Sequence, residues 1–229
     1  MVATCQDMGL GAASAFSGPA KWRRLGTRLE WSSAGSEDAS LMADVYNHWV
    51  KHGARVPMVL PTTEQRVRVM IADLQRCGYP VWCFWYGDEL VGWCSWGPFP
   101  WGGSGTLGVS DFSVYVLPQW VGVGVGAQAV FLAYRQRHVI GFHSLVVWVL
   151  RGNRLSRNLA HGVGLQRWGV LPRVVDAGDS MRHDVELWGC HLDNAAWCAH
   201  MDRLGTRLEK RMGGWVRERR KAVATPALV

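Results

Sequence analysis

Apolar residues in the first third of the chain repeat at helical spacing in two segments, behind a short strand expected at 27–32. Ser36 and an acidic first turn precede the first apolar stripe, which consists of Leu41, Met42, Val45 and Trp49. Thr62 and Gln65 have the spacing of a capping box ahead of the second stripe, which consists of Val67, Met70, Ile71 and Leu74. The pattern predicts a strand followed by two helices.

The middle of the chain changes from helical spacing to the alternation of strands. Aromatic and β-favouring residues flank a turn at 87–88 over the stretch 81–96, which predicts a hairpin. After a loop rich in Gly and Pro, a strand is expected at 111–117, with one face formed by Phe112, Val114 and Val116. Three alternating glycines, a helical stripe and a further strand at 144–150 follow. The order is therefore strand, turn, helix, strand.

The last third predicts a short helix at 153–161, an irregular or extended piece at 165–174 and a final strand at 185–192. Beyond them, one apolar stripe marks an otherwise basic helix that we expect to be an appendage: Met201, Leu204, Leu208, Met212 and Trp215. We expect one α/β (α+β) domain at 27–193, with a mixed central sheet flanked by helices. A flexible extension at 1–26 and a basic amphipathic helix at 194–229 complete the expected organisation.

Composition fits this picture and excludes several classes of protein. A chain of 229 residues with 48% hydrophobic residues can bury one sizeable core. No apolar run approaches the roughly 18 residues that a membrane-spanning helix needs, so no membrane association is expected. The first 26 residues lack the order of a secretory signal, and the six cysteines form no CxxC pair, so a reducing cytoplasm is expected. His48 and His52 have metal-binding spacing but lack further ligands nearby, so we expect no metal.

The formal net charge of +7 is concentrated near the end of the chain. Eight Lys or Arg residues lie between 203 and 221 against two acidic residues, so the rest of the chain is close to neutral. Such a segment can contact nucleic acid, but it lacks interleaved aromatic residues beyond Trp215. A solvated or oligomer-packing face is the preferred interpretation, and nucleic acid is not an expected partner.

The glycines at 122, 124 and 126 stand between the predicted strand at 111–117 and the following helix. Glycine lets the backbone approach a ligand closely, and the amide groups at a helix N-terminus attract anions such as a pyrophosphate. The alternative is that the glycines only allow close packing. A P-loop is excluded because no Lys-Ser/Thr pair follows, and the spacing lacks the two-residue gap of a dinucleotide fingerprint.

Seven segments in order resemble the GNAT superfamily of acetyltransferases, and within it the phosphinothricin and methionine sulfoximine branch. They cover about residues 29–193 and consist of 45–48, 88–92, 113–118, 121–127, Asn153 with Ser156, 164–165 and 183–185. The resemblance implies acetyl-CoA as co-substrate, a homodimer, and transfer to the amine of a small, amino-acid-like molecule. A GNAT domain with a weakened site, serving as an acyl-CoA-binding or sensor module, is the alternative.

The resemblance also implies roles for residues. The backbone of Val114, Tyr115 and Val116 would pair with the pantetheine arm, with further coenzyme contacts from Asn153 and Ser156. The amides of the turn would hold the pyrophosphate: Val121, Gly122, Val123, Gly124, Val125, Gly126 and Ala127. Related turns begin with Gln or Arg and often carry another basic residue, where this chain has Val121, Gly122 and Val123. The missing charge costs about 1–3 kcal/mol of binding free energy.

Acetyl transfer needs an unprotonated amine and a donor to the developing oxyanion. Asp111 occupies the place of the proposed catalytic Glu of the resembled family, and its alternative is a solvated residue at a strand start. The oxyanion donor is expected to be the backbone N–H of Tyr115 or Val116. Trp93, Trp96, Phe99 and Trp101 can border a substrate cleft or pack the hairpin. His183 corresponds to a segment near the substrate pocket of the resembled family, and its alternative is a structural histidine.

Overall fold

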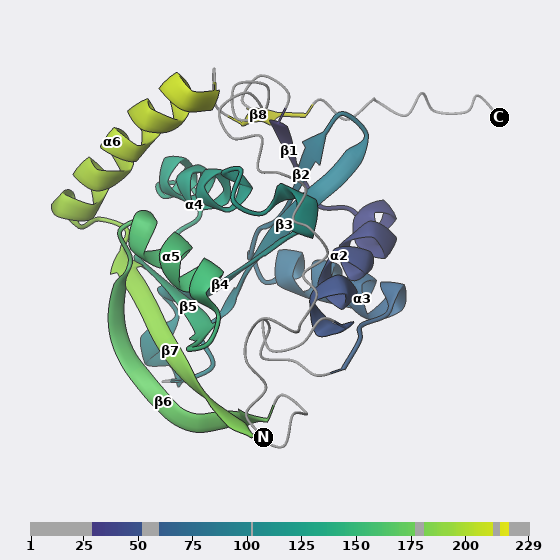
Figure 1. The fold of residues 1–229 in the computed structure, drawn as a ribbon, viewed down its shortest axis with the longest axis horizontal. Helices are drawn as coiled ribbons and strands as arrows, with labels where there is room; N and C mark the ends of the chain where they lie inside the picture. Colours follow the sequence, from purple (N-terminus) through teal and green to yellow (C-terminus); the bar gives the residue numbers. More distant parts are fainter. Residues whose placement is uncertain (1–28, 52–59, 102, 177–180, 213–215, 220–229) are drawn as a thin grey trace, which may run out of the picture.

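Figure 1 presents the computed structural model, which describes residues 29–51, 60–101, 103–176, 181–212 and 216–219. The expected extension at 1–26, His52, Trp215 and the last ten residues lie outside the described residues. None of the described helices is both long enough and apolar enough to cross a membrane. In the same part of the chain, no three His, Cys, Asp or Glu side chains are grouped so that they could hold a metal ion.

One eight-stranded mixed sheet runs through the molecule in the order β6-β7-β5-β4-β3-β2-β1-β8. Its strands are β1 (Leu29–Ser33), β2 (Val81–Tyr86), β3 (Glu89–Pro98), β4 (Val109–Val116), β5 (Ser144–Leu150), β6 (Gln166–Asp176), β7 (Arg182–His191) and β8 (Arg217–Glu218). Neighbours pair antiparallel, except that β4 with β5 and β1 with β8 are parallel. The expected hairpin, the strand at 144–150 and the mixed sheet are confirmed.

Helices cover both faces of the sheet (Figure 1). One face carries α2 (Ala39–Lys51) and α3 (Glu64–Arg76), and the other carries α4 (Val125–Gln136), α5 (Arg154–Gly162) and α6 (Ala195–Met212). The core divides accordingly into two clusters of buried side chains, one under α2 and α3 and a larger one under α4, α5 and α6. The sheet thus separates two packed layers of side chains, one on each of its faces.

The start of α3 differs from the expected capping box by one residue. Thr63 is the N-cap, with its hydroxyl accepting the backbone N–H of Arg66 at 3.3 Å. Thr62 lies one residue before the cap, where the Asn47 side chain binds its backbone twice, at 2.7 Å to the N–H and 2.9 Å to the carbonyl. The prediction of Thr62 as the cap was therefore wrong, and Asn47 instead ties α2 to the entry of α3.

The C-terminal helix α6 is an integral part of the core, and the expectation of an appendage was wrong. Trp197, Met201 and Leu208 are buried in the larger core cluster. The Trp197 indole N–H donates to the carbonyl of Val163, at the end of α5, at 3.0 Å, and the Tyr134 hydroxyl of α4 donates to Asp202 at 2.7 Å. Helix α6 is therefore fixed to both helices that follow the central strands.

Helix α5 is held against the sheet by a buried carboxylate. Glu186 of β7 is fully buried, and its oxygens lie 3.3 Å from Nε of Arg157 on α5 and 3.5 Å from Nη1 of Arg167 on β6. The Trp188 indole N–H also donates to Glu186, at 3.0 Å. A buried charge is tolerated only when such partners compensate for its lost hydration.

Candidate functional site

The central parallel strands separate halfway along their length. Pairing of β4 with β5 ends at Asp111 opposite Val146, although β4 continues to Val116 and β5 to Leu150. Side chains and open backbone then line the space between the strands. A ligand in this gap can contact the helices on both faces of the sheet.

The register of β4 with β3 determines which backbone groups face this gap. Val116 stands opposite Gly92, and the N–H of Leu117 donates to the Val91 carbonyl at 2.9 Å. In an antiparallel pair this pattern turns the N–H and C=O groups of Val114 and Val116 away from β3. The Trp49 indole N–H donates to the Val116 carbonyl at 2.9 Å. The Val116 N–H and both backbone groups of Val114 remain directed towards the gap.

Two glycines of the turn adopt backbone conformations that other residues rarely adopt. Gly122 and Gly124 have φ angles of 78° and 102°, and Gly124 is the N-cap of α4. The first helical hydrogen bond runs from the N–H of Gln128 to the Gly124 carbonyl at 2.9 Å. The amides of the first turn, from 125 to 127, therefore have no acceptor within the helix. They form a donor set for an anion.

Gly126 serves close packing instead. A Cβ at this position would lie 2.8 Å from Cδ2 of Leu159, so the glycine lets α4 and α5 approach each other. Val123 and Val125 are buried, which leaves only their backbone to a ligand. Gly126 therefore fits the close-packing interpretation, whereas the conformations of Gly122 and Gly124 are compatible with the anion-binding one.

The turn borders a cavity of about 510 Å³, here called the turn cavity. It extends from the end of β4 past the glycine turn to α5, and Trp49, Trp120 and Arg207 are among its lining residues. Trp120 is tied to the start of β3 because its indole N–H donates to Glu89 at 3.0 Å. The cavity combines amide donors with apolar walls, as expected of a site for a ligand that has both anionic and apolar parts.

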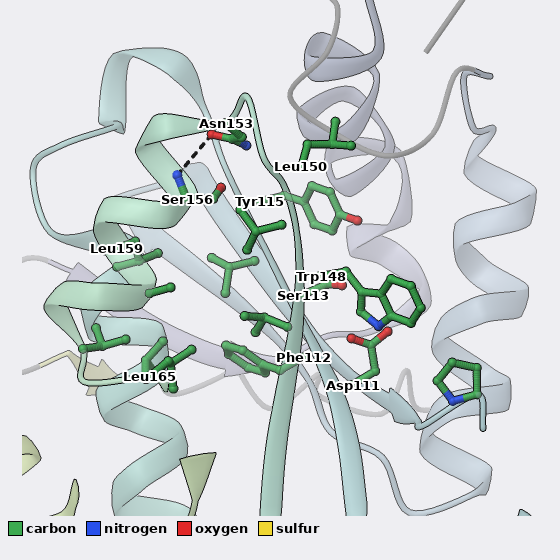
Figure 2. A pocket seen from close by; sticks show the side chains of 17 residues that line it. Asp111, Phe112, Ser113, Tyr115, Trp148, Leu150, Asn153, Ser156, Leu159 and Leu165 are labelled. Atoms are coloured by element: carbon green, nitrogen blue, oxygen red, sulfur yellow. Dashed lines mark hydrogen bonds between the residues drawn. The ribbon is translucent and has the colours of Figure 1, made fainter. Parts of the chain in front are cut away.

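A second cavity of about 400 Å³, the Asp111 cavity, adjoins it along β4 (Figure 2). Both cavities are lined by Val114, Tyr115, Asn153 and Ser156. Asn153 caps α5, and its side-chain oxygen accepts the backbone N–H of Ser156 at 3.1 Å. The predicted residues Asn153 and Ser156 thus lie where the two cavities meet.

Asp111 is the one acidic side chain among the described lining residues of its cavity. Burial raises the pKa of this carboxyl to about 6, and its Oδ1 is buried with no hydrogen-bond partner in the described structure. Trp148 of β5, which Figure 2 shows beside Asp111, likewise has a buried indole N–H without a partner there. A carboxylate with this pKa is largely ionised at pH 7 and is a better proton acceptor than an ordinary Asp.

The combination of a parallel gap, a glycine turn and helix-terminal amides fits acetyl-CoA. The amides of the turn suit its phosphates, the open edge at Val114 and Val116 suits the amide groups of its pantetheine arm, and the apolar walls suit the rest of that arm. Asn153 and Ser156 add polar side chains beside that path.

No protein-family model and no curated protein matches the sequence. Among solved structures, a candidate acetyltransferase from Salmonella typhimurium with its cofactor acetyl-CoA matches with a TM-score of 0.68 and 23% identity, covering 74% of this chain and 96% of that one. An N-acetyltransferase from Staphylococcus aureus matches with a TM-score of 0.67 and 21% identity, covering 72% and 99%. A GNAT phosphinothricin acetyltransferase from Sinorhizobium meliloti in complex with acetyl-CoA matches with a TM-score of 0.67 and 16% identity, covering 74% and 91%.

The chain has the GNAT acetyltransferase fold. In this fold the gap between β4 and β5 brings together Asp111, Val114, Val116, the glycine turn, Asn153 and Ser156, which were all predicted site residues. Tyr115 requires a correction in one respect. It stands in a hydrogen-bonded pair with Trp93, so its backbone N–H faces β3 and cannot reach an oxyanion in the gap. The Val116 N–H is the candidate donor.

The Tyr115 side chain belongs to an aromatic cluster with α2. Its ring centroid lies 4.4 Å from that of Trp93 and 5.3 Å from that of Tyr46. The indole N–H of Trp93 donates to the Met42 carbonyl at 3.0 Å, and burial raises the pKa of the Tyr115 hydroxyl well above its usual range. Trp93 therefore supports the floor of the cavity without lining it, and Tyr115 remains a neutral phenol at physiological pH.

Two other predicted substrate contacts lie away from both cavities. Trp96 is fully buried in the larger core cluster, where it packs against Phe112 with ring centroids 5.0 Å apart. His183 lies on β7 opposite Val175 of β6, towards the edge of the sheet. Sequence reasoning also missed lining residues, notably Trp148 and Arg207. Trp148 lay within the expected strand, where alternation alone does not tell which face opens onto a gap.

Proposed function

We propose that the protein is an N-acetyltransferase that moves an acetyl group directly from acetyl-CoA to the amine of a small molecule. The observation that carries this proposal is the opening between β4 and β5, which joins a carboxylate cavity at Asp111 to an amide-lined cavity at the glycine turn. A nucleophile and a phosphate-bearing acyl donor could meet along β4 in such an arrangement. The fold of acetyltransferases solved with acetyl-CoA supports it.

The chain offers a candidate group for each step of this reaction. Bound acetyl-CoA supplies the thioester whose carbonyl carbon is attacked. Asp111 accepts a proton from the incoming ammonium group, directly or through one water, so that the amine nitrogen can form the new C–N bond as the C–S bond breaks. The Val116 N–H donates to the carbonyl oxygen as negative charge develops there. The departing thiolate carries the electron pair and takes up a proton.

The deciding experiment is a titration of acetyl-CoA by calorimetry followed by a thiol-release assay over a panel of amines. Saturable binding with thiol release above background on at least one amine is expected. Absence of acetyl-CoA binding would reject the proposal at its first step. Binding without release on any amine would reject the enzymatic part of it.

The acceptor predicted from the resemblance is amino-acid-like, of the phosphinothricin or methionine sulfoximine type, and two structural neighbours carry the name of a phosphinothricin acetyltransferase. The described lining of the Asp111 cavity contains one carboxylate and no Lys, Arg or His. An anionic acceptor would meet no compensating cation there. The panel should therefore pair both compounds with matched amines that lack a carboxylate. Higher kcat/KM for the carboxylate-free member of each pair would contradict the amino-acid acceptor.

A second candidate function is an acyl-CoA-binding or sensor module, favoured by the absence of a basic side chain at Val121 and Val123. Binding of acetyl-CoA that is unchanged in Asp111→Asn, with no turnover on any amine, would select this candidate.

We also propose a cytoplasmic homodimer. Its stoichiometry can be checked from the molar mass in light scattering.

A further inference from the structure

The C-terminal helix α6 forms part of the wall of the turn cavity. Leu204, Arg207 and Leu208 line it, and their i, i+3, i+4 spacing places them on one face of the helix. Leu208 is buried, whereas Arg207 is exposed at the same face. The cationic side chain therefore stands at the edge of the cavity, with an apolar neighbour holding the helix in place.

The position of Arg207 is fixed by contacts along the preceding turns of α6. His200 Nε2 lies 3.0 Å from the Gly162 carbonyl at the end of α5. The Tyr134 hydroxyl of α4 donates to Asp202, and Met201 is fully buried. Because α4 begins at the glycine turn and α5 lines both cavities, these contacts hold the Arg207 backbone in a fixed relation to the turn.

The glycine turn itself has no charged side chain. Its side chains at 121 and 123 are both Val, so only backbone dipoles there can meet an anion. Among the described residues that line the turn cavity, Arg207 is the one with a charged side chain. It makes no hydrogen bond or ion pair with any other residue that the structure describes. As far as the described residues go, its five N–H donors are therefore available to a phosphate.

We propose that Arg207 binds a phosphate group of acetyl-CoA and replaces, from a different helix, the basic side chain missing from the turn. This inference rests on the proposed function, because it requires the coenzyme to occupy the turn cavity. The guanidinium can meet either the pyrophosphate or the 3′-phosphate. Both present paired oxygens to its planar fork.

The test is calorimetric titration of the full-length chain with acetyl-CoA, comparing the wild type, Arg207→Gln and Arg207→Lys. Loss of a charge-assisted hydrogen bond is expected to raise the Kd about tenfold to a hundredfold in Arg207→Gln. Lys keeps the charge but loses the fork, so a smaller rise is expected. The Kd should also respond less steeply to added salt in Arg207→Gln, because one fewer ionic contact with phosphate remains.

Arg203→Gln is the matched control. Arg203 is exposed on the same helix, four residues earlier, and does not line the cavity. It removes the same charge from the protein's overall field, so its Kd should change less than about twofold. Far-ultraviolet circular dichroism and the Tm of each variant show whether the helix is intact, which the exposure of both side chains leads us to expect.

Two truncated ligands identify the phosphate. Coenzyme without the 3′-phosphate should bind the wild type and Arg207→Gln equally if Arg207 meets that group, and unequally if it meets the pyrophosphate. Acetylated pantetheine, which has neither, should not distinguish the two proteins. If the wild type binds acetyl-CoA and Arg207→Gln binds it as tightly as Arg203→Gln, the inference is wrong. If the wild type fails to bind, the proposed function itself has failed.

Discussion

Burial of the Asp111 carboxyl lowers the free energy of unfolding at neutral pH and makes this group a stronger base. Desolvation raises its pKa from 3.8 to about 6, which makes it a stronger base than a solvated Asp. Between those two values the folded protein holds a proton that the unfolded chain has lost. The free energy of unfolding therefore falls as the pH rises from about 4 to about 6, and the loss persists at neutral pH.

Replacing Asp111 with Asn should separate these two effects. We expect kcat to fall about 10²- to 10⁴-fold, the usual loss when a general base is removed. We also expect the free energy of unfolding at pH 7 to rise, by up to about 1–3 kcal/mol, because the buried charge is gone. Activity assays and thermal melts at pH 4, 5.5 and 7 check both.

Asp193→Asn, an exposed position, is the control for this variant. Its stability and activity should follow the wild type at each pH. An Asp111→Asn protein that keeps wild-type kcat would remove Asp111 from the mechanism. One whose advantage in stability is the same at pH 4 and pH 7 would contradict the raised pKa.

Individual elements differ in how well the sequence predicts them. The segment from β4 to β5 was predicted closely because each part has its own strong signal: alternation, Pro118, the glycine turn, a helical apolar stripe and an apolar run. Strand β6 was predicted only as an irregular or extended piece because most of its residues are exposed and its register with β7 shifts twice, which interrupts the alternation. The start of α3 lies one residue later than predicted because two adjacent threonines carry the same local capping signal, and Thr63 is the one that caps the helix.

The residues that contribute to the candidate site through their backbone could be predicted from the sequence. The side chains that come together there from distant elements could not. Gly122 and Gly124 could be singled out from the sequence because glycine permits the positive φ angles that both residues adopt. Arg207 and Trp148 reach their cavities only because α6 packs on α4 and because β5 separates from β4. Neither event leaves a local pattern in the sequence. The exclusion of the Tyr115 amide likewise depends on strand register, which alternation alone does not set.

Glu186 links three elements and should be sensitive to substitution. Changing it to Ala removes the carboxylate that pairs with Arg157 and Arg167 and that accepts from the Trp188 indole, and because both guanidiniums are about half exposed and can be hydrated, the expected loss is about 1–3 kcal/mol. Urea unfolding measures the loss. Glu186→Gln keeps the shape and one acceptor for Trp188, so it should lose less. Equal stability of the wild type and Glu186→Ala would show that the network contributes nothing net.

At the scale of the whole molecule, the chain closes on itself after α6. Strand β8 pairs in parallel with β1, and Arg219 lies 3.0 Å from Asp88 and over the Trp85 ring. The segment after residue 193 therefore packs on α4 and α5 through α6 and adds the edge strand β8 next to β1. A region expected to be a basic amphipathic helix appended to the domain instead connects distant parts of one core.

Two truncations test this integration. Ending the chain after residue 193 removes Trp197, Met201 and Leu208 from the core, and each buried side chain of this size contributes about 1.5–3 kcal/mol. Since a typical domain has only about 5–15 kcal/mol of stability, we expect loss of cooperative unfolding and binding of a hydrophobic dye. Ending it after residue 219 keeps every described contact and should preserve the wild-type Tm. If the shorter protein melts cooperatively at the same temperature, α6 is an appendage after all, and Arg207 has no fixed place beside the turn.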